Sequence, residues 1–150
     1  MKDENLKNEE ELQSYLIKRV EKILKEKGKK LIGWDEILEG GLAPEATVMS
    51  WRGMGGGIEA AKMQHHVVMS PTQFCYFDYG QTDVKIVPRE KNWGLLRLSQ
   101  VYKFEPVPDS VDSQYILGGQ GNLWSEFIPN CRQKEYMTWP RGLALAEVLW

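Results

Sequence analysis

The chain has 150 residues, of which 42% are hydrophobic and 27% are charged, so it can bury a core and is not compositionally disordered. Its formal net charge is −2 and no basic stripe occurs, which argues against nucleic-acid binding driven by phosphate contacts. No apolar run is long enough to span a membrane, the polar N-terminus does not resemble a signal peptide, and two cysteines are too few for a disulfide framework.

The first periodic segment of the chain is Glu10–Lys27. Its apolar residues recur at three- and four-residue spacing, which predicts an amphipathic helix. Asn8 can cap this helix, and Glu11 three residues later completes a capping box. Gly28 lies where the C-terminus of a helix commonly adopts left-handed backbone. We therefore predict a helix over Glu10–Lys27.

Four short apolar runs follow, each bounded by polar or turn-like residues, and each is predicted to be a buried strand. These runs are Leu31–Trp34, Thr47–Trp51, His66–Ser70 and Tyr115–Gly119. A short helix is predicted over Gly57–Met63, between the second and third strands, and a helical tail is predicted over Met137–Trp150. Strands that alternate with helices favour a parallel α/β sheet.

The spacing of the strands separates two α/β architectures. About 38 residues per strand is close to the repeat of a barrel of eight βα units. A doubly wound domain of this length usually has five strands and a glycine-rich phosphate turn after the first, and no such turn follows Leu31–Trp34. The chain also begins and ends in helical sequence, which favours half of a barrel from a longer protein. A long irregular insertion is expected at about 75–114.

In a parallel barrel, ligands bind at the C-terminal ends of the strands. Each predicted strand is followed by an aromatic residue, and three of the four segments also carry a carboxylate: they are Trp34–Glu36, Trp51–Gly53, Tyr76–Tyr79 and Trp124–Glu126. Aromatic rings bury the apolar faces of sugars, while carboxylates and tyrosine hydroxyls bond to sugar hydroxyls. Any one of these aromatics could be an ordinary core residue. Four at corresponding positions favour a sugar site.

The segments Gly33–Leu38, Ser50–Gly53, Tyr76–Tyr79 and Gly118–Glu126 resemble the family 20 glycoside hydrolases, the β-N-acetylhexosaminidases. The tail Trp139–Glu147 resembles their final helix. The match runs in order over nearly the whole chain and corresponds to the second half of that family's barrel. The resemblance implies that residues 1–150 are the C-terminal half of a catalytic (β/α)8 TIM barrel, with about four parallel strands and flanking helices.

The same resemblance implies a reaction. It is the removal of terminal, non-reducing β-linked N-acetylhexosamine by substrate-assisted retaining catalysis, in which the substrate's own acetamide attacks the anomeric carbon. Tyr76 matches the tyrosine whose hydroxyl bonds the acetamide. The other matching positions are Trp34, Trp51 and Trp124, which wall the acetamide pocket and the sugar face, and Asp78 and Glu126, which accept hydrogen bonds from sugar hydroxyls. No metal and no organic cofactor is implied.

The family's catalytic Asp-Glu pair follows a His-x-Gly-Gly sequence on an earlier strand. Asp35 and Glu36 follow Gly33–Trp34 instead, so we interpret them as structural or peripheral. The general acid is then absent from residues 1–150, as is the arginine that family members supply from an earlier strand. The fragment alone is expected to be inactive. Its open strand edges predict a homo-oligomer.

Other conspicuous residues are interpreted as structural. His65–His66 open a strand at the end opposite the expected site, which favours a turn or solvent-facing pair over a metal site. Gly53–Gly57 lacks the Lys-Ser/Thr of a P-loop and is interpreted as a βα loop that keeps clear of the sugar. Cys75 has no histidine placed to activate it, so a neutral packed thiol is expected. Trp139–Pro140 is expected to pack at a helix start.

Two alternative functions stay open at this point. A non-catalytic carbohydrate-binding module could retain the aromatic pocket, and it is favoured if the gene upstream of Met1 lacks a His-x-Gly-Gly-Asp-Glu stretch. A doubly wound domain that binds a small ligand would need a fifth strand. The sequence leaves open the hexosamine, the linkage, the glycan and the cellular compartment. It also leaves open whether Trp93, in the insertion, covers a substrate subsite.

Overall fold

The computed structural model describes residues 4–82 and 93–150. The chain forms two compact units. Unit 1 comprises Met1–Met69 and Asp109–Leu117, and unit 2 comprises Ser70–Pro108 and Gly118–Trp150. Each unit is therefore assembled from two separate stretches of the chain.

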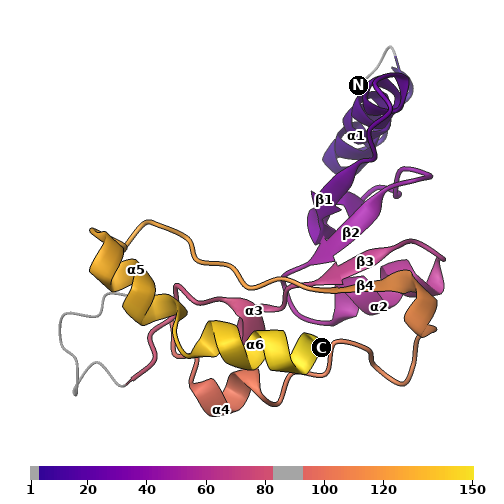
Figure 1. The fold of residues 1–150 in the computed structure, drawn as a ribbon. Coiled ribbons are helices and arrows are strands. Elements are labelled where there is room, and N and C mark those ends of the chain that lie inside the picture. The colour runs from indigo at the N-terminus through magenta and orange to yellow at the C-terminus, as the bar shows by residue number, and fades with distance from the viewer. Residues whose placement is uncertain (1–3, 83–92) are drawn as a thin grey trace. The chain divides into compact units, whose positions relative to one another are not determined.

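Four strands form one sheet in the order β1-β2-β3-β4 (Figure 1). They are β1 (Ile32–Trp34), β2 (Thr47–Ser50), β3 (Val67–Met69) and β4 (Ile116–Gly119). The β1–β2 and β2–β3 pairs are both parallel, with Gly33 opposite Val48 and Met49 opposite Val68. Helical segments separate consecutive strands, as parallel pairing requires. The predicted parallel α/β sheet with flanking helices is confirmed, and each predicted strand contains the observed one.

The first helix, α1 (Glu9–Glu26), matches the predicted segment to within one residue at each end. The Oδ1 atom of Asn8 accepts a hydrogen bond from the backbone N–H of Glu11 at 2.8 Å, as an N-cap should. The Glu11 side chain accepts from the backbone N–H of Lys7 at 2.9 Å rather than from Asn8, so the expected capping box is shifted by one residue. Gly28 ends the helix region with a φ of +65°, the left-handed backbone expected there.

The second helix, α2 (Gly55–Lys62), lies against β2 and β3 in unit 1. It begins two residues before the predicted start, and its glycines allow close packing. A Cβ at Gly57 would lie 2.7 Å from Sδ of Met69, and a Cβ at Gly56 would lie 2.9 Å from Cβ of Asp35. The buried Ser50 hydroxyl accepts a hydrogen bond from the Gly57 N–H at 2.9 Å. The glycine run therefore serves the packing of a helix N-terminus onto the sheet.

Unit 2 contains the remaining α-helices. They are α3 (Thr72–Cys75), α4 (Leu98–Val101), α5 (Cys131–Thr138) and α6 (Arg141–Leu149), and α4 packs against α3 and α6. The prediction of one helical tail over Met137–Trp150 is wrong, because two helices meet there. Pro140 lacks an N–H and disfavours helical backbone in the residue before it, and Trp139 accordingly has a ψ of 142°. The expected helix start at Trp139–Pro140 agrees with the start of α6 at Arg141.

Hydrogen bonds join described parts of the predicted insertion at about 75–114. Gly80 and Leu95 form an isolated parallel bridge, in which the Gly80 N–H donates to the Gly94 carbonyl and the Leu96 N–H donates to the Gly80 carbonyl, both at 2.8 Å. The short helices α4 and η3 (Ser113–Tyr115) also lie within this stretch, while residues 83–92 lie outside the described residues. Among the helices in the described part of the chain, none is long and apolar enough to cross a membrane.

Candidate functional site

In unit 1, the loop after β2 is held by the short 3-10 helix η2 (Asp35–Leu38), which follows β1 directly. Asp35 is only 2% exposed, and its Oδ2 atom accepts hydrogen bonds from the backbone N–H groups of Trp51 at 3.0 Å and Arg52 at 3.2 Å. Its Oδ1 atom accepts from Nε of Arg52 at 2.6 Å. These contacts give Asp35 a structural role in the loop after β2, in keeping with its interpretation as a structural or peripheral residue.

The neighbouring carboxylate, Glu36, contacts the side chain of Trp51. The indole Nε1 of Trp51 lies 3.1 Å from Oε1 and 3.0 Å from Oε2 of Glu36, so both carboxylate oxygens face one N–H donor. Trp51 is half-buried, as is Trp34, the last residue of β1. Adjacent carboxylates of η2 thus hold both the backbone and the ring of one predicted pocket residue.

Arg52 is the cation that pairs with two of the carboxylates in this region. Its guanidinium donates to Asp35 through Nε and to Oε1 of Glu39 through Nη1 at 2.7 Å, and these two carboxylates raise the pKa of Arg52, the contact with Glu39 contributing most. Arg52 itself is 44% exposed by side chain. In the loop beyond β2, the backbone N–H groups of Trp51 and Arg52 therefore donate to carboxylates. The Arg52 guanidinium and the Trp51 indole N–H do the same.

In unit 2, the segment that carries Tyr76 is joined to the segment beyond β4 by an isolated parallel bridge between Tyr76 and Asn122. The Asn122 N–H donates to the Cys75 carbonyl at 2.7 Å, and the Phe77 N–H donates to the Asn122 carbonyl at 2.6 Å. Tyr76 is 7% exposed, and its ring meets that of Tyr79 edge-on at 6.1 Å. Tyr76 therefore lies beyond α3, seven residues past the end of β3, and not directly at a strand end.

The side chain of Asn122 adds a second set of contacts. Its Nδ2 donates to the Ser70 hydroxyl at 2.6 Å, the Ser70 hydroxyl donates to the Gln120 carbonyl at 2.9 Å, and Nε2 of Gln120 donates back to Oδ1 of Asn122 at 2.6 Å. This closed set of bonds anchors the segment that leads to Trp124 and Glu126.

Arg141, at the start of α6, is fully buried and holds the segment around Asp78. Its guanidinium donates to the carbonyls of Phe77 at 2.6 Å, Tyr79 at 2.8 Å and Leu96 at 3.0 Å, and also to the carbonyl of Met137. The guanidinium also lies over the Phe77 ring, 5.2 Å from its centroid. The two residues that flank Asp78 are thus tied to one buried cation.

Asp78 is 4% exposed, and its buried Oδ1 atom has no hydrogen-bond partner within the described residues. Burial is the main cause that raises the pKa of Asp78 to about 6, and the charge of Glu126 adds to this shift, whereas a backbone hydrogen bond and the charge of Arg141 oppose it. Asp78 and Glu126 are therefore close enough to interact electrostatically. A buried acceptor without a donor is an arrangement that a ligand hydroxyl can satisfy.

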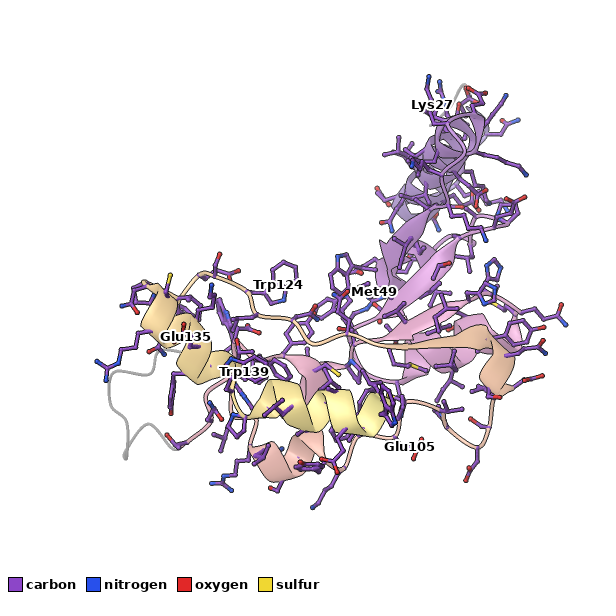
Figure 2. The ribbon with its side chains drawn as sticks, in the orientation of Figure 1. Lys27, Met49, Glu105, Trp124, Glu135 and Trp139 are labelled. Atoms are coloured by element: carbon purple, nitrogen blue, oxygen red, sulfur yellow. The ribbon has the colours of Figure 1, made fainter. Side chains whose placement is uncertain are left out.

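Trp124 is 42% exposed and lies on the extended segment between β4 and α5, with its indole directed away from the ribbon (Figure 2). Trp93 is 63% exposed, and its ring packs against Phe127 with the centroids 5.2 Å apart. Trp139 lies at the junction of α5 and α6. The ring neighbour of Trp93, Phe127, directly follows Glu126 in the sequence.

The other conspicuous residues have structural contacts. Burial raises the pKa of the Cys75 thiol to about 12, which agrees with the expected neutral packed thiol. Nδ1 of His65 lies 2.8 Å from the Ala46 carbonyl, and the His66 ring lies against Tyr115. Within the described residues, no group of three or more His, Cys, Asp or Glu side chains could hold a metal ion.

Sequence reasoning missed three positioning residues: Glu36 as the partner of the Trp51 indole, Asn122 as the bridge between segments, and Arg141 as the anchor of the Asp78 segment. The chain offered a weak signal for two of them. Asn122 is a hydrogen-bonding residue within a glycine-rich run, and Arg141 is a charged residue at the start of an otherwise apolar helix. Neither pattern identifies the partner, which comes from a distant part of the sequence.

Comparison with known proteins finds a family match over the whole chain. A model of "Glycosyl hydrolase family 20, catalytic domain" matches residues 1–150. A β-hexosaminidase from Porphyromonas gingivalis is 50% identical over 154 residues, which are 100% of this chain and 20% of that relative. A β-hexosaminidase from Vibrio furnissii is 32% identical over 97% of this chain and 25% of its own length. The chain thus spans about a fifth to a quarter of the length of these relatives.

Solved structures show the same similarity. A GH20 exo-β-N-acetylglucosaminidase from Vibrio harveyi, in complex with N-acetylglucosamine, has a TM-score of 0.84 and 28% identity over 100% of this chain and 24% of its own. A Streptomyces plicatus N-acetyl-β-hexosaminidase has a TM-score of 0.79 and 27% identity over 91% of this chain and 29% of its own.

Proposed function

Because this chain belongs to glycoside hydrolase family 20, we propose that it forms part of the catalytic barrel of a β-N-acetylhexosaminidase. The protein that contains it removes terminal, non-reducing β-linked N-acetylhexosamine. Residues 1–150 supply the C-terminal half of the barrel, with the insertion at about 75–114. The four-stranded parallel sheet and the match of the whole chain to the family's catalytic domain support this assignment.

In the proposed reaction, the substrate's 2-acetamido group attacks the anomeric carbon, and the configuration of that carbon is retained. Trp34, Trp51 and Trp124 wall the acetamide and the sugar face and restrict the acetamide to an attacking pose. The Tyr76 hydroxyl donates a hydrogen bond to the acetamide oxygen and so holds that oxygen in line with the anomeric carbon that it attacks. The general acid that protonates the leaving oxygen comes from outside residues 1–150.

The single observation that best supports a sugar ligand is the buried Oδ1 atom of Asp78. Leaving a buried acceptor unsatisfied costs about 1–3 kcal/mol, so a sugar hydroxyl that donates to Asp78 recovers this free energy on binding. The neighbouring Glu126 is exposed and can accept from a second hydroxyl of the same sugar. These two interacting carboxylates and the exposed Trp124, two residues before Glu126, match the mixed polar and apolar surface of a sugar ring.

The test is turnover of an aryl N-acetyl-β-glucosaminide by the full-length protein, with the aryl β-glucoside as a matched control. Substrate assistance predicts that hydrolysis requires the acetamide and that ¹H NMR detects the β-anomer as the first product. A chimera in which residues 1–150 replace the matching segment of the Porphyromonas gingivalis relative tests the same residues in a complete barrel. Binding of N-acetylglucosamine without turnover in both proteins would instead support a carbohydrate-binding module.

A further inference from the structure

We propose that Glu36 is a positioning residue for the acetamide pocket, because its carboxylate holds the indole of Trp51 in the orientation that the pocket requires. This inference rests on the proposed function. It assigns a role to a carboxylate that lies next to the pocket tryptophans, in the segment Trp34–Glu36. Glu36 does not transfer a proton in this role. It acts through Trp51.

The geometry of the contact restricts the ring of Trp51. An indole has a single N–H donor, and here that donor faces both oxygens of Glu36 at 3.0 and 3.1 Å. The backbone N–H of Trp51 is held independently by Asp35 at 3.0 Å. Two adjacent residues of η2 therefore hold the two ends of Trp51, which leaves its χ1 and χ2 angles little freedom. A hydrogen bond to a carboxylate is roughly twice as strong as one between neutral groups.

Within the described residues, the Glu36 carboxylate bonds to the Trp51 indole and not to the neighbouring cation. Arg52, the nearby cation, donates to Asp35 and Glu39. The contact that Gln13 makes with Glu36 goes to the Glu36 backbone carbonyl at 2.8 Å, which fixes the helix that carries the carboxylate. A carboxylate that only balanced charge would instead pair with Arg52.

The orientation of a pocket wall matters for a reaction in which the substrate supplies its own nucleophile. A tryptophan that can rotate enlarges the space around the acetamide and lets it leave the attacking pose, and small misplacements can lower rates by about 10²-fold. We therefore expect Glu36→Leu in the full-length protein to lower kcat by between about 10- and 100-fold with a smaller change in KM. The preference for N-acetyl over N-propionyl substrates should weaken as well.

Three further variants separate positioning from a general structural role. Glu36→Gln keeps an acceptor and should recover most of the lost rate. Glu39→Gln is the matched control, because it removes a nearby carboxylate that contacts Arg52 in the same loop and should leave kcat and acyl preference unchanged. In a Trp51→Phe background, which lacks the indole N–H, Glu36→Leu should cost little, because coupled residues are not additive.

Fluorine NMR on full-length protein labelled with 5-fluorotryptophan gives a readout that does not depend on turnover. The resonance assigned to Trp51 by the Trp51→Phe variant should shift or broaden in Glu36→Leu and stay in place in Glu39→Gln. If the protein does not hydrolyse the substrate but this resonance responds, positioning of Trp51 stands and the proposed function fails. An unmoved resonance in a folded Glu36→Leu protein, or an equal rate loss with and without the Trp51 indole, would overturn the positioning role.

Discussion

The Tyr76 hydroxyl is the side-chain group in this chain whose removal should most clearly separate catalysis from binding. In the full-length protein, Tyr76→Phe should lower kcat by about 10²-fold, the size of loss that misplacement of a reacting group can cause. KM should change less, because the hydrogen bond aligns the nucleophilic acetamide in the transition state. Steady-state kinetics on an aryl N-acetyl-β-glucosaminide measure both constants. An unchanged kcat would remove Tyr76 from the site.

The buried carboxyl of Asp78 predicts a dependence of stability on pH. Its pKa in the folded protein is raised from 3.8 to about 6, so the folded state binds this proton more tightly than the unfolded state. The stability that the neutral carboxyl contributes is therefore complete below pH 3.8 and is lost as the pH rises through 6. Asp78→Asn cannot ionise, so its melting temperature relative to wild type should be more favourable at pH 7 than at pH 4.

The control for this experiment is Asp109→Asn, since Asp109 is exposed. Its melting temperature relative to wild type should stay constant across the same pH range. Calorimetric scans of the full-length protein at pH 4, 5, 6 and 7 give both differences. A constant difference for Asp78→Asn would mean that the carboxyl titrates as it does in the unfolded chain.

At the scale of elements, two glycines of α2 give a matched pair of substitutions that should change the stability of the protein in opposite directions. Gly55→Ala meets no atom within 4 Å, so it should stabilise the protein by up to about 1 kcal/mol through reduced backbone entropy of the unfolded chain. Gly57→Ala places a Cβ 2.7 Å from Sδ of the fully buried Met69 and 3.1 Å from Cβ of Ser50. Overpacking of this kind typically costs about 1–3 kcal/mol.

The measurement is the denaturation midpoint of each variant in the full-length protein. Equal and favourable shifts for both variants would show that α2 does not pack against Met69 as closely as the structure has it. The same packing explains why the glycine run is no phosphate loop. Its Gly57 N–H is already bonded to the Ser50 hydroxyl, and Gly56 lies against Asp35.

At the scale of the whole molecule, residues 1–150 expressed alone should not hydrolyse the aryl glycoside, since general acid catalysis typically supplies about 10²–10⁴-fold of the rate and the proposed reaction takes its general acid from outside residues 1–150. The chain should also self-associate. β1 and β4 are the outer strands of the sheet, and Ile32 and Leu117 on them are 50% and 60% exposed. Open edges and exposed apolar side chains favour a second copy as partner.

Size-exclusion chromatography with light scattering tests the assembly, and a stable species at the monomer mass of 17.3 kDa at micromolar concentration would contradict it. Turnover by rigorously purified chain would contradict the first part and would reopen a catalytic role for Asp35 and Glu36. The Asp35→Asn and Glu36→Gln variants of the isolated chain would then show whether that turnover depends on either carboxylate.

Local patterns were sufficient for α1, the four strands and most of α2. The α1 helix follows from an apolar face that repeats every 3.6 residues. The four strands follow from short continuous apolar runs, because strands of a parallel sheet are buried on both faces, and their alternation with helices indicates their parallel order. Local patterns failed at α5, whose polar sequence shows little periodicity, and at Pro140, which divides the predicted tail into two helices.

By itself, the sequence determined the family, through motifs that occur in order along the chain, and with it the fold class and the candidate pocket residues. Only the tertiary structure decided how those residues are held. Glu36 meets the Trp51 indole across 15 positions, Ser70 meets Asn122 across 52, and Arg141 meets the Phe77 carbonyl across 64. Such contacts satisfy buried polar groups whose partners are chosen by the fold, so no local pattern of apolar and polar residues encodes them.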